Sequence, residues 1–334
     1  MDDLVRVAQA KAAYQAVLLA KPNVVGVGTG YRTVGKRLTD QVCLVTLVRR
    51  KVPLAGLEVQ ALVPTEIDGV PTDVLEVGDL RIQKPRDLRW RPAPGGVSIS
   101  HFRVTAGTFG CLVRDRRTGV RLILSNNHVL ANSNQAVLGD AVLQPGALDG
   151  GSAEDDQLGR LERFIPIQFN DQPGECSVAR SVAAVGNALA RLVGSRHRLA
   201  VRRVDPQAAN WVDAAVARPL QDAWVDEEIL EIGRVIGTAA PGLGMPVRKS
   251  GRTTGLTRGE IQVLDTTVTI GYGDRQARFD GQIVTSAMSS PGDSGSLLVA
   301  GDRLAAVGLL FAGSEQATIH NPIAQVLEAL EVSL

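Results

Sequence analysis

The sequence has few cysteines, and their arrangement excludes a dense disulfide framework. Its 334 residues include only Cys43, Cys111 and Cys176, which lie far apart and show no CxxC spacing, and their odd number leaves at least one unpaired. The four histidines are scattered too, without the i, i+4 spacing of a helical metal pair, so no metal site is predicted. We therefore expect a reduced, cytoplasmic protein.

Long apolar runs and a large net charge are also missing. No stretch approaches the roughly 18 uninterrupted apolar residues of a membrane-spanning helix. The chain opens with two acids after its first residue, where a secretion signal has basic residues. The formal net charge is +1, so no overall field draws the chain toward polyanions. We expect neither nucleic acid nor a membrane as a partner.

Residues 1–82 have the pattern of a small α+β domain. Apolar residues at helical spacing predict a helix over residues 3–20. Strands are predicted in NVVGVGTGY, QVCLVTLVRRKV and TEIDGVPTDVLEVG, which are rich in β-branched residues. The glycines of GVGTG lack G-x-G-x-x-G spacing and favour a bent strand over a phosphate loop. A regulatory, docking or oligomerisation role stays open, and unpaired strand edges favour a homo-oligomer.

The pattern of apolar residues changes after a predicted linker. Residues 83–96, QKPRDLRWRPAPGG, contain four basic side chains and three prolines, which is typical of a linker. Residues 97–334 consist mainly of short apolar runs between glycine-rich turns, the rhythm of a β-sandwich or barrel. An amphipathic helix is expected over 175–194, packed on the barrel. A C-terminal surface helix is expected with Asn321 as N-cap and Pro322 at its first position.

One serine carries the signal for catalysis. Ser294 stands between glycines in SSPGDSGSLLV, and a serine becomes a nucleophile only beside an imidazole that a carboxylate orients. His128 follows an apolar strand in LSNNHVLA, and Asp213 stands alone in the apolar run NWVDAAVA, where an unpaired charge is costly. GDSGS alone would be an ordinary turn. Asp205 and Asp226 are alternative candidates for the orienting acid, but the residues around them are less apolar than those around Asp213. Together the three motifs predict a catalytic triad.

These motifs, in the order His, Asp, Ser, resemble the chymotrypsin-like (trypsin-fold) serine peptidases over residues 96–334. Within that family, VRKSGRTTGLTRGEI and LSNNHVLA resemble the intracellular bacterial and plant branch that includes the plant NARROW LEAF proteins. The resemblance implies a mainly β fold with two barrels, and a serine endopeptidase that cleaves protein or peptide substrates without a cofactor. It implies His128 as general base, Asp213 as orienting acid and Ser294 as nucleophile, with Gly292 and Ser294 N–H groups as the oxyanion hole.

The same resemblance implies a specificity pocket. Met288 would lie at its base, where an enzyme specific for basic residues has an acid. Leu310 stands where glutamate-selective relatives have a histidine. The adjoining strand would shape the pocket and hydrogen-bond the substrate backbone; its residues are Phe311, Ala312 and Gly313. We therefore expect cleavage after neutral, small-to-medium apolar residues.

Two departures from the family leave alternatives open. The cysteines that bracket the histidine in secreted relatives are absent. Secreted zymogens are activated when a freed N-terminus pairs with the aspartate before the nucleophile, here Asp293, but roughly 95 residues precede this barrel, so Asp293 needs another partner. A vestigial triad in a scaffold or peptide-binding adaptor, and an esterase acting on small acyl substrates, are the alternative functions.

Overall fold

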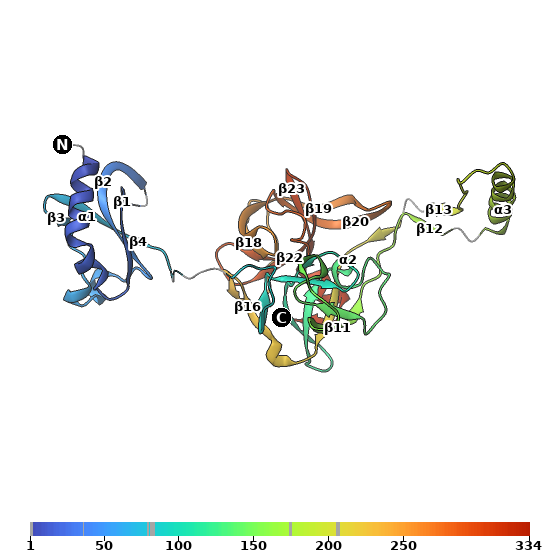
Figure 1. Ribbon diagram of the computed structural model, residues 1–334, viewed down its shortest axis with the longest axis horizontal. Helices are drawn as coiled ribbons and strands as arrows, with labels where there is room; N and C mark the ends of the chain where they lie inside the picture. Colours follow the sequence, from blue (N-terminus) through green and yellow to red (C-terminus); the bar gives the residue numbers. More distant parts are fainter. Residues whose placement is uncertain (1–2, 36, 79, 81–83, 174–175, 205–207) are drawn as a thin grey trace. The chain divides into compact units, whose positions relative to one another are not determined.

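The computed structural model describes residues 3–35, 37–78, 80, 84–173, 176–204 and 208–334. The chain divides into two compact units, Met1–Lys84 and Pro85–Leu334, each of which is described by itself (Figure 1). Within the described residues, no helix is both long enough and apolar enough to cross a membrane.

The N-terminal unit is a helix packed on a four-stranded sheet of order β1-β2-β4-β3. Its elements are α1 (Asp3–Leu19), β1 (Val24–Val34), β2 (Arg37–Val48), β3 (Glu66–Ile67), β4 (Val70–Glu76) and 3-10 helices at Leu54–Gly56 and Val59–Ala61. Val7 and Leu18 of α1 join Leu44 and Val70 of the sheet in one buried cluster. The unit combines one helix with a sheet, and the GVGTG glycines lie within β1, whose pairing with β2 is irregular between Val24 and Gly26.

The first barrel of the second unit is an antiparallel sheet of order β24-β8-β9-β15-β11-β10-β6-β7. Its strands are β6 (Ser98–His101), β7 (Gly107–Thr108), β8 (Cys111–Asp115), β9 (Arg121–Ser125), β10 (Ala141–Leu143), β11 (Gln157–Phe164), β15 (Ala215–Pro219) and β24 (Val332–Ser333). Successive side chains of a strand point to opposite faces. Ile123 therefore joins the cluster around Phe109, while Leu124 joins a different cluster.

The second barrel has the strand order β14-β20-β19-β18-β21-β22-β23, and β20 also pairs with β23, which closes the ring. Its strands are β14 (Ala209–Asn210), β18 (Pro246–Gly251), β19 (Gly255–Tyr272), β20 (Arg275–Ser286), β21 (Leu297–Ala300), β22 (Ala306–Gly313) and β23 (Ala317–Pro322). Closure gives each strand of the ring two neighbours over at least part of its length. The mainly β, double-barrel fold class predicted from the sequence is thereby confirmed.

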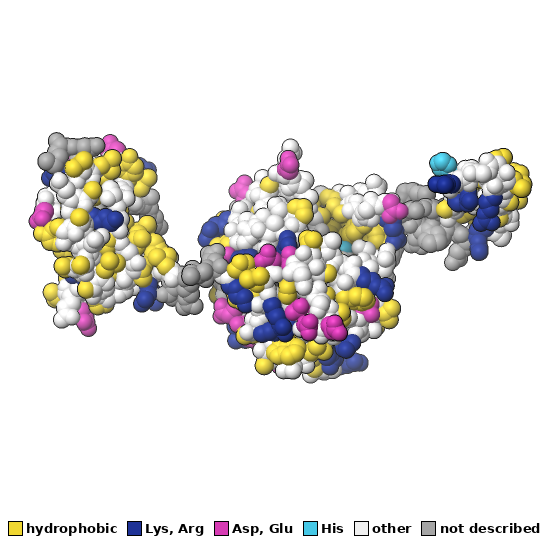
Figure 2. All heavy atoms as spheres, in the orientation of Figure 1, with side chains coloured by type: hydrophobic (Ala, Val, Ile, Leu, Met, Phe, Trp, Pro, Cys, Tyr) yellow, Lys and Arg dark blue, Asp and Glu magenta, His cyan; other side chains and the backbone are white. Residues whose placement is uncertain are grey.

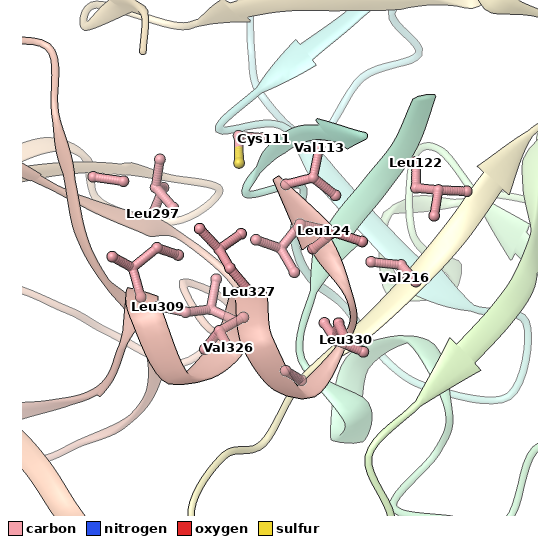
Figure 3. Close-up of a cluster of buried hydrophobic side chains, with 14 of the residues drawn as sticks. Cys111, Val113, Leu122, Leu124, Val216, Leu297, Leu309, Val326, Leu327 and Leu330 are labelled. Carbon is pink, nitrogen blue, oxygen red and sulfur yellow. The ribbon is translucent and has the colours of Figure 1, made fainter. Parts of the chain in front are cut away.

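A large apolar cluster contains side chains of both barrels. Figure 3 shows Leu124 of the first barrel and Leu309 of the second converging on Val326, Leu327 and Leu330 at the C-terminal helix, α4 (Ile323–Ala329). Complete burial of one such side chain contributes roughly 1.5–3 kcal/mol. This shared core fixes the two barrels against each other, and the groove between them is where a site built from both can form.

The sequence prediction for the C-terminal helix is wrong in two respects. Helix α4 begins after Pro322, and no side chain caps its N-terminus. Asn321 instead lies fully buried in β23, where its amide donates to Gln282 and its oxygen accepts from the backbone N–H of Asp213. The helix also buries Ile323, Val326 and Leu327, because its apolar side fills the junction between the barrels.

The segment predicted as a linker, 83–96, belongs in large part to the second unit. A short sheet has the order β17-β16-β5, with β5 (Ala93–Gly95), β16 (Val225–Ile229) and β17 (Gly233–Arg234). Ala93 is fully buried, and the Arg86 guanidinium donates to Ser250 Oγ and pairs with Glu231. Arg86, one of the residues that suggest a solvated hinge, therefore has partners on the barrel; residue 83 itself lies outside the described residues.

The helical insertion is present as α3 (Ser177–Leu192), between the paired strands β12 (Asp171–Pro173) and β13 (Arg202–Val204). Residue 175, at the start of the predicted range, lies outside the described residues. The expected packing of the helix on the barrel is not observed, because none of its side chains is buried. The remaining 3-10 helices are Ala147–Asp149 and Asp222–Trp224.

Candidate active site

The first barrel supplies an imidazole and a carboxylate that are bonded to each other. His128 lies in the one-turn helix α2 (Asn127–Leu130) that follows β9, and Asp213 lies in the turn between β14 and β15. Nδ1 of His128 is 2.6 Å from Oδ2 of Asp213, and the backbone N–H of His128 donates to Oδ1 at 3.2 Å. An ionised carboxylate only accepts hydrogen bonds, so this contact places the proton on Nδ1 and leaves Nε2 as the acceptor.

Asp213 is fully buried and held from several sides. Its backbone N–H donates to Asn321, and its backbone oxygen accepts from Asn126 at 2.7 Å. The Tyr272 hydroxyl donates to Oδ2 of the carboxylate at 2.8 Å. This hydroxyl and the two His128 N–H groups donate to the carboxylate itself and compensate for the desolvation of its charge. Of the competing acids, Asp226 lies in β16 and Asp205 lies outside the described residues.

The second barrel supplies Ser294 in a tight turn before β21. The backbone of Gly292 and Gly295 has φ of +98° and +95°, a left-handed conformation that glycine adopts without strain. A Cβ on Gly292 would also lie 2.5 Å from Thr253 Oγ1, so the turn demands glycine for two reasons. The Ser294 hydroxyl has no hydrogen-bond partner among the described residues.

The same turn leaves two backbone donors available. Asp293 N–H donates to Ser290 O and Gly295 N–H donates to Leu310 O, both within the fold. Within the described parts of the chain, the N–H groups of Gly292 and Ser294 have no acceptor. They are the two groups for which the family resemblance implies an oxyanion hole, and this bonding pattern leaves both able to donate to a ligand.

The partner of Asp293 is Lys249. The Lys249 ammonium is 3.0 Å from Oδ2 of Asp293, and both side chains are fully buried. Thr253 and Thr254 add backbone N–H donors to Oδ1, and the Thr254 hydroxyl adds a third to Oδ2. Lys249, Thr253 and Thr254 belong to the motif VRKSGRTTGLTRGEI, so this part of the sequence encloses the aspartate that precedes the nucleophile.

The pKa values of this pair reflect burial and pairing together. Burial on its own raises the pKa of Asp293, but the Lys249 charge and the surrounding hydrogen bonds hold it below its ordinary value. Burial lowers the pKa of Lys249, and the Asp293 charge opposes that shift. Asp293 is thus anionic at neutral pH, with its charge compensated inside the fold.

Two cavities meet beside these groups. One, of about 750 Å³, is lined by Ser294 together with Met288, Leu310, Ala312 and Gly313. The other, of about 450 Å³, is lined by residues that include His128, Tyr272 and Phe311, and it shares Ala312 and Gly313 with the first. The residues that line this pair of adjoining cavities include His128 and Ser294 and the five pocket residues singled out in the sequence, whereas Asp213 and Gly292 line neither.

Several site residues were missed from the sequence. Tyr272 ends a long strand with no motif around it, and Asn321 has the sequence signature of a helix cap. Lys249 lies within a motif that was quoted only for its resemblance. Glu315 is exposed and lines the larger cavity, and it follows the strand that was considered for the pocket.

Comparisons with known proteins are consistent with this geometry. No family model matches the chain. Streptogrisin-D of Streptomyces griseus is 39% identical over 92 residues, which is 26% of this chain and 22% of the relative. Streptogrisin-C of the same organism is 29% identical over 234 residues, or 62% of this chain and 50% of the relative. The chain thus spans half or less of the length of these relatives.

Among solved structures, a Nocardiopsis protease (NAPase) aligns with 72% of this chain and 99% of its own, at 19% identity and a TM-score of 0.46. The partial sequence matches to streptogrisins, taken with the double barrel and the bonded His128–Asp213 pair, support a relationship between this chain and the chymotrypsin-fold serine peptidases.

Proposed function

We propose that the chain is a serine endopeptidase that hydrolyses peptide bonds through an acyl-enzyme. The observation that carries the proposal is the 2.6 Å contact between His128 Nδ1 and the buried Asp213 carboxylate, beside the glycine-bracketed turn of Ser294. In this reaction Ser294 Oγ attacks the substrate carbonyl while Nε2 of His128 accepts its proton. The imidazolium then donates that proton to the leaving amine, and a water molecule, activated by His128, hydrolyses the acyl-enzyme.

The backbone of the nucleophile's turn supports the same reaction. The N–H groups of Gly292 and Ser294 would donate to the oxyanion of the tetrahedral intermediate, and one such donor contributes about 3 kcal/mol or more. Asp213 remains ionised and stabilises the imidazolium that forms beside it. No step requires a metal or a cofactor, since the nucleophile, base and electrostatic groups all come from the chain.

The decisive experiment is labelling with a fluorophosphonate probe, which reacts with an activated serine. Wild type should be labelled and Ser294→Ala should not. Ser290→Ala is the matched control, because it removes a hydroxyl from the same cavity wall, and it should be labelled like wild type. Unlabelled wild type would support the alternative function, a scaffold or adaptor with a vestigial triad. Hydrolysis of a small ester without cleavage of casein would favour the esterase.

We further propose cleavage after neutral apolar residues. Met288 is almost completely buried at the wall of the larger cavity, which Leu310 also lines, so neither of these two residues would pair with a charged side chain. Glu315, at the same cavity, would repel an acidic side chain. Profiling with a peptide library tests this specificity: preference for Asp or Glu contradicts it, and preference for Lys or Arg would assign the recognition to Glu315 instead.

The substrate backbone would bind along β22. This strand pairs with β21 only as far as Leu309, whereas its pairing with β23 continues to Gly313. Phe311, Ala312 and Gly313 therefore border the cavities with a paired neighbour on one side. A peptide in extended conformation could add to that edge as an antiparallel strand.

We also retain the narrower assignment to the intracellular branch that includes the NARROW LEAF proteins. Its support is the motif around Lys249, Thr253 and Thr254, which bonds to Asp293 from within the chain. A freed N-terminus is not needed for that contact. Activity of the full chain with its N-terminal domain uncut would agree with this assignment, and activity only after cleavage near the unit boundary would contradict it.

A further inference from the structure

The charge of the chain is distributed unevenly. We call residues 176–204 the basic insertion, because this stretch contains six arginines and neither Asp, Glu nor Lys. The arginines are Arg180, Arg191, Arg196, Arg198, Arg202 and Arg203. The whole chain has a formal net charge of only +1, so the rest of it carries an excess of acids. The overall value conceals a strongly basic segment.

The helix of the basic insertion has a continuous apolar stripe. Its apolar residues are spaced alternately four and three apart, which places them along one side of a helix; they are Val178, Val182, Val185, Leu189 and Leu192. Each of these side chains is between 59% and 83% exposed. Arg180 and Arg191 lie on the opposite side of the helix by the same periodicity. The helix is therefore amphipathic, yet its apolar stripe is in contact with solvent.

The chain after α3 folds back along the helix, beside Gly186 and Asn187 rather than along the apolar stripe. The Asn187 side chain donates to the backbone oxygen of Leu199 at 2.9 Å and accepts from its N–H at 2.7 Å. Gly186 makes room for the returning chain, since a Cβ there would lie 2.7 Å from Leu199 Cδ1. Leu199 is still 59% exposed. The returning chain thus brings an exposed leucine, with Arg196 and Arg198 beside it in the sequence, next to the helix.

Three kinds of partner could cover such a surface, and charge separates them. A second copy would bring the same exposed arginines of α3 and the returning chain to the contact, so like charges would oppose pairing. A nucleic acid would pair with the arginines through its phosphates but would leave the aliphatic stripe without a partner. The surface of an anionic bilayer satisfies both features, because its headgroups attract arginine and its acyl region accepts the aliphatic side chains.

We propose that the basic insertion binds the surface of anionic lipid bilayers, with α3 lying in the plane of the interface and its apolar stripe directed toward the acyl chains. Figure 2 shows this segment with blue basic and yellow apolar side chains exposed. The expectation of no membrane partner rested on the net charge of the whole chain. That average does not apply to a segment whose basic residues lie together. The proposal is independent of the peptidase activity.

The test is flotation of the full chain with lipid vesicles. Vesicles of phosphatidylcholine and phosphatidylserine should carry the protein, vesicles of phosphatidylcholine alone should not, and added salt should weaken the binding. Val182→Asn with Leu189→Asn should reduce binding to anionic vesicles by about tenfold or more, and so should Arg196→Gln with Arg198→Gln. All four positions are exposed, so the barrels should keep the melting temperature of wild type.

Matched controls make the same chemical changes elsewhere. Ile236→Asn with Leu243→Asn replaces two exposed apolar side chains of the second unit, and Arg234→Gln with Arg303→Gln removes two exposed charges there. Both control variants should bind anionic vesicles as wild type does. Equal loss in the controls would overturn the proposal, because binding would then follow overall charge or apolarity.

Three further results would also overturn it. The first is the absence of flotation with anionic vesicles, or equal flotation with neutral ones. The second is a fall in solution mass on Val182→Asn with Leu189→Asn without any lipid binding, which would assign the stripe to a second copy. The third is binding of a DNA or RNA oligonucleotide that the arginine changes abolish and the apolar changes leave intact.

Discussion

The hydroxyl of Tyr272 donates to Oδ2 of Asp213 at 2.8 Å, and this is the same oxygen that lies 2.6 Å from Nδ1 of His128. Tyr272 ends β19 in the second barrel, whereas Asp213 precedes a strand of the first. Burial, and then the adjacent Asp213 charge, raise the pKa of Tyr272 well above its ordinary value, so the phenol remains a donor. The second barrel thus helps to position the acid of the first.

The first prediction follows from this contact. Tyr272→Phe keeps the ring but removes a donor to a charged acceptor, a bond that contributes roughly 1.5–3 kcal/mol. We expect kcat to fall by about tenfold to a hundredfold, with KM nearly unchanged, since the imidazolium of the transition state loses support. Steady-state kinetics on a peptide substrate measures this split. Tyr31→Phe makes the same change at an exposed site in the N-terminal unit and should have no effect.

The second prediction concerns the triad as a unit. Ser294→Ala and His128→Ala should each reduce kcat by several orders of magnitude, and the double variant should lose little more than either alone. The reason is that the base has no function once the nucleophile is gone. Residual turnover measured at high enzyme concentration checks the comparison. Losses that simply multiply in the double variant would count against a shared step.

A third prediction concerns the buried ion pair. Lys249→Met leaves the Asp293 carboxylate buried without its counter-charge, and removal of one partner from such a pair costs about 3–5 kcal/mol of stability. We expect a lower denaturation midpoint in urea and loss of activity, because Asp293 precedes the nucleophile. Lys51→Met, at an exposed position, should change neither. Wild-type stability and turnover in Lys249→Met would show that Asp293 has another source of compensation.

The fourth prediction concerns stability at low pH. His320 is fully buried, and burial, with a smaller contribution from the Lys249 charge, lowers its pKa from 6.5 to about 3. Between these two values the unfolded state binds the proton and the folded state does not, so stability falls as the pH falls. The contribution is about 1.4 kcal/mol per pH unit.

The variant His320→Gln tests that contribution, because an amide does not titrate. Urea unfolding should show a pH dependence that is shallower than wild type by about 1.4 kcal/mol per unit between pH values of about 4 and 6. His197 is exposed, so His197→Gln serves as the control and should keep the wild-type slope. Equal slopes in wild type and His320→Gln would mean that His320 titrates normally in the folded state.

The sequence carries the parts of the site that depend on local pattern. The turn of Ser294 requires glycines at positive φ, and an aspartate in an apolar run requires a buried partner. Both requirements can therefore be recognised from the sequence alone. The alternation of short apolar runs likewise predicts the barrels. The small N-terminal domain follows from the same periodicity argument.

The missed residues depend on contacts between distant segments. Tyr272 reaches Asp213 across 59 positions, and Lys249 reaches Asp293 across 44, with no local feature at either tyrosine or lysine. Asn321 before proline has the pattern of a helix cap, but its side-chain oxygen instead accepts a hydrogen bond from the buried backbone N–H of Asp213. Residues 85–96 resemble a hinge because arginine and proline usually face solvent, whereas here Arg86 finds Ser250 and Glu231. Tertiary partners decided each of these cases.

The lysine beside Asp293 has a consequence for control. Under the proposed function, the charge that completes the site is encoded in β18 of the same unit as the nucleophile, so folding alone delivers it. Cleavage of the chain at another place is not needed to provide a positive charge for Asp293. Under the proposed function, processing of the chain is therefore not required to form this ion pair. The amount of protein made, its rate of removal and the supply of substrate chains are means of control that need no cut in the chain.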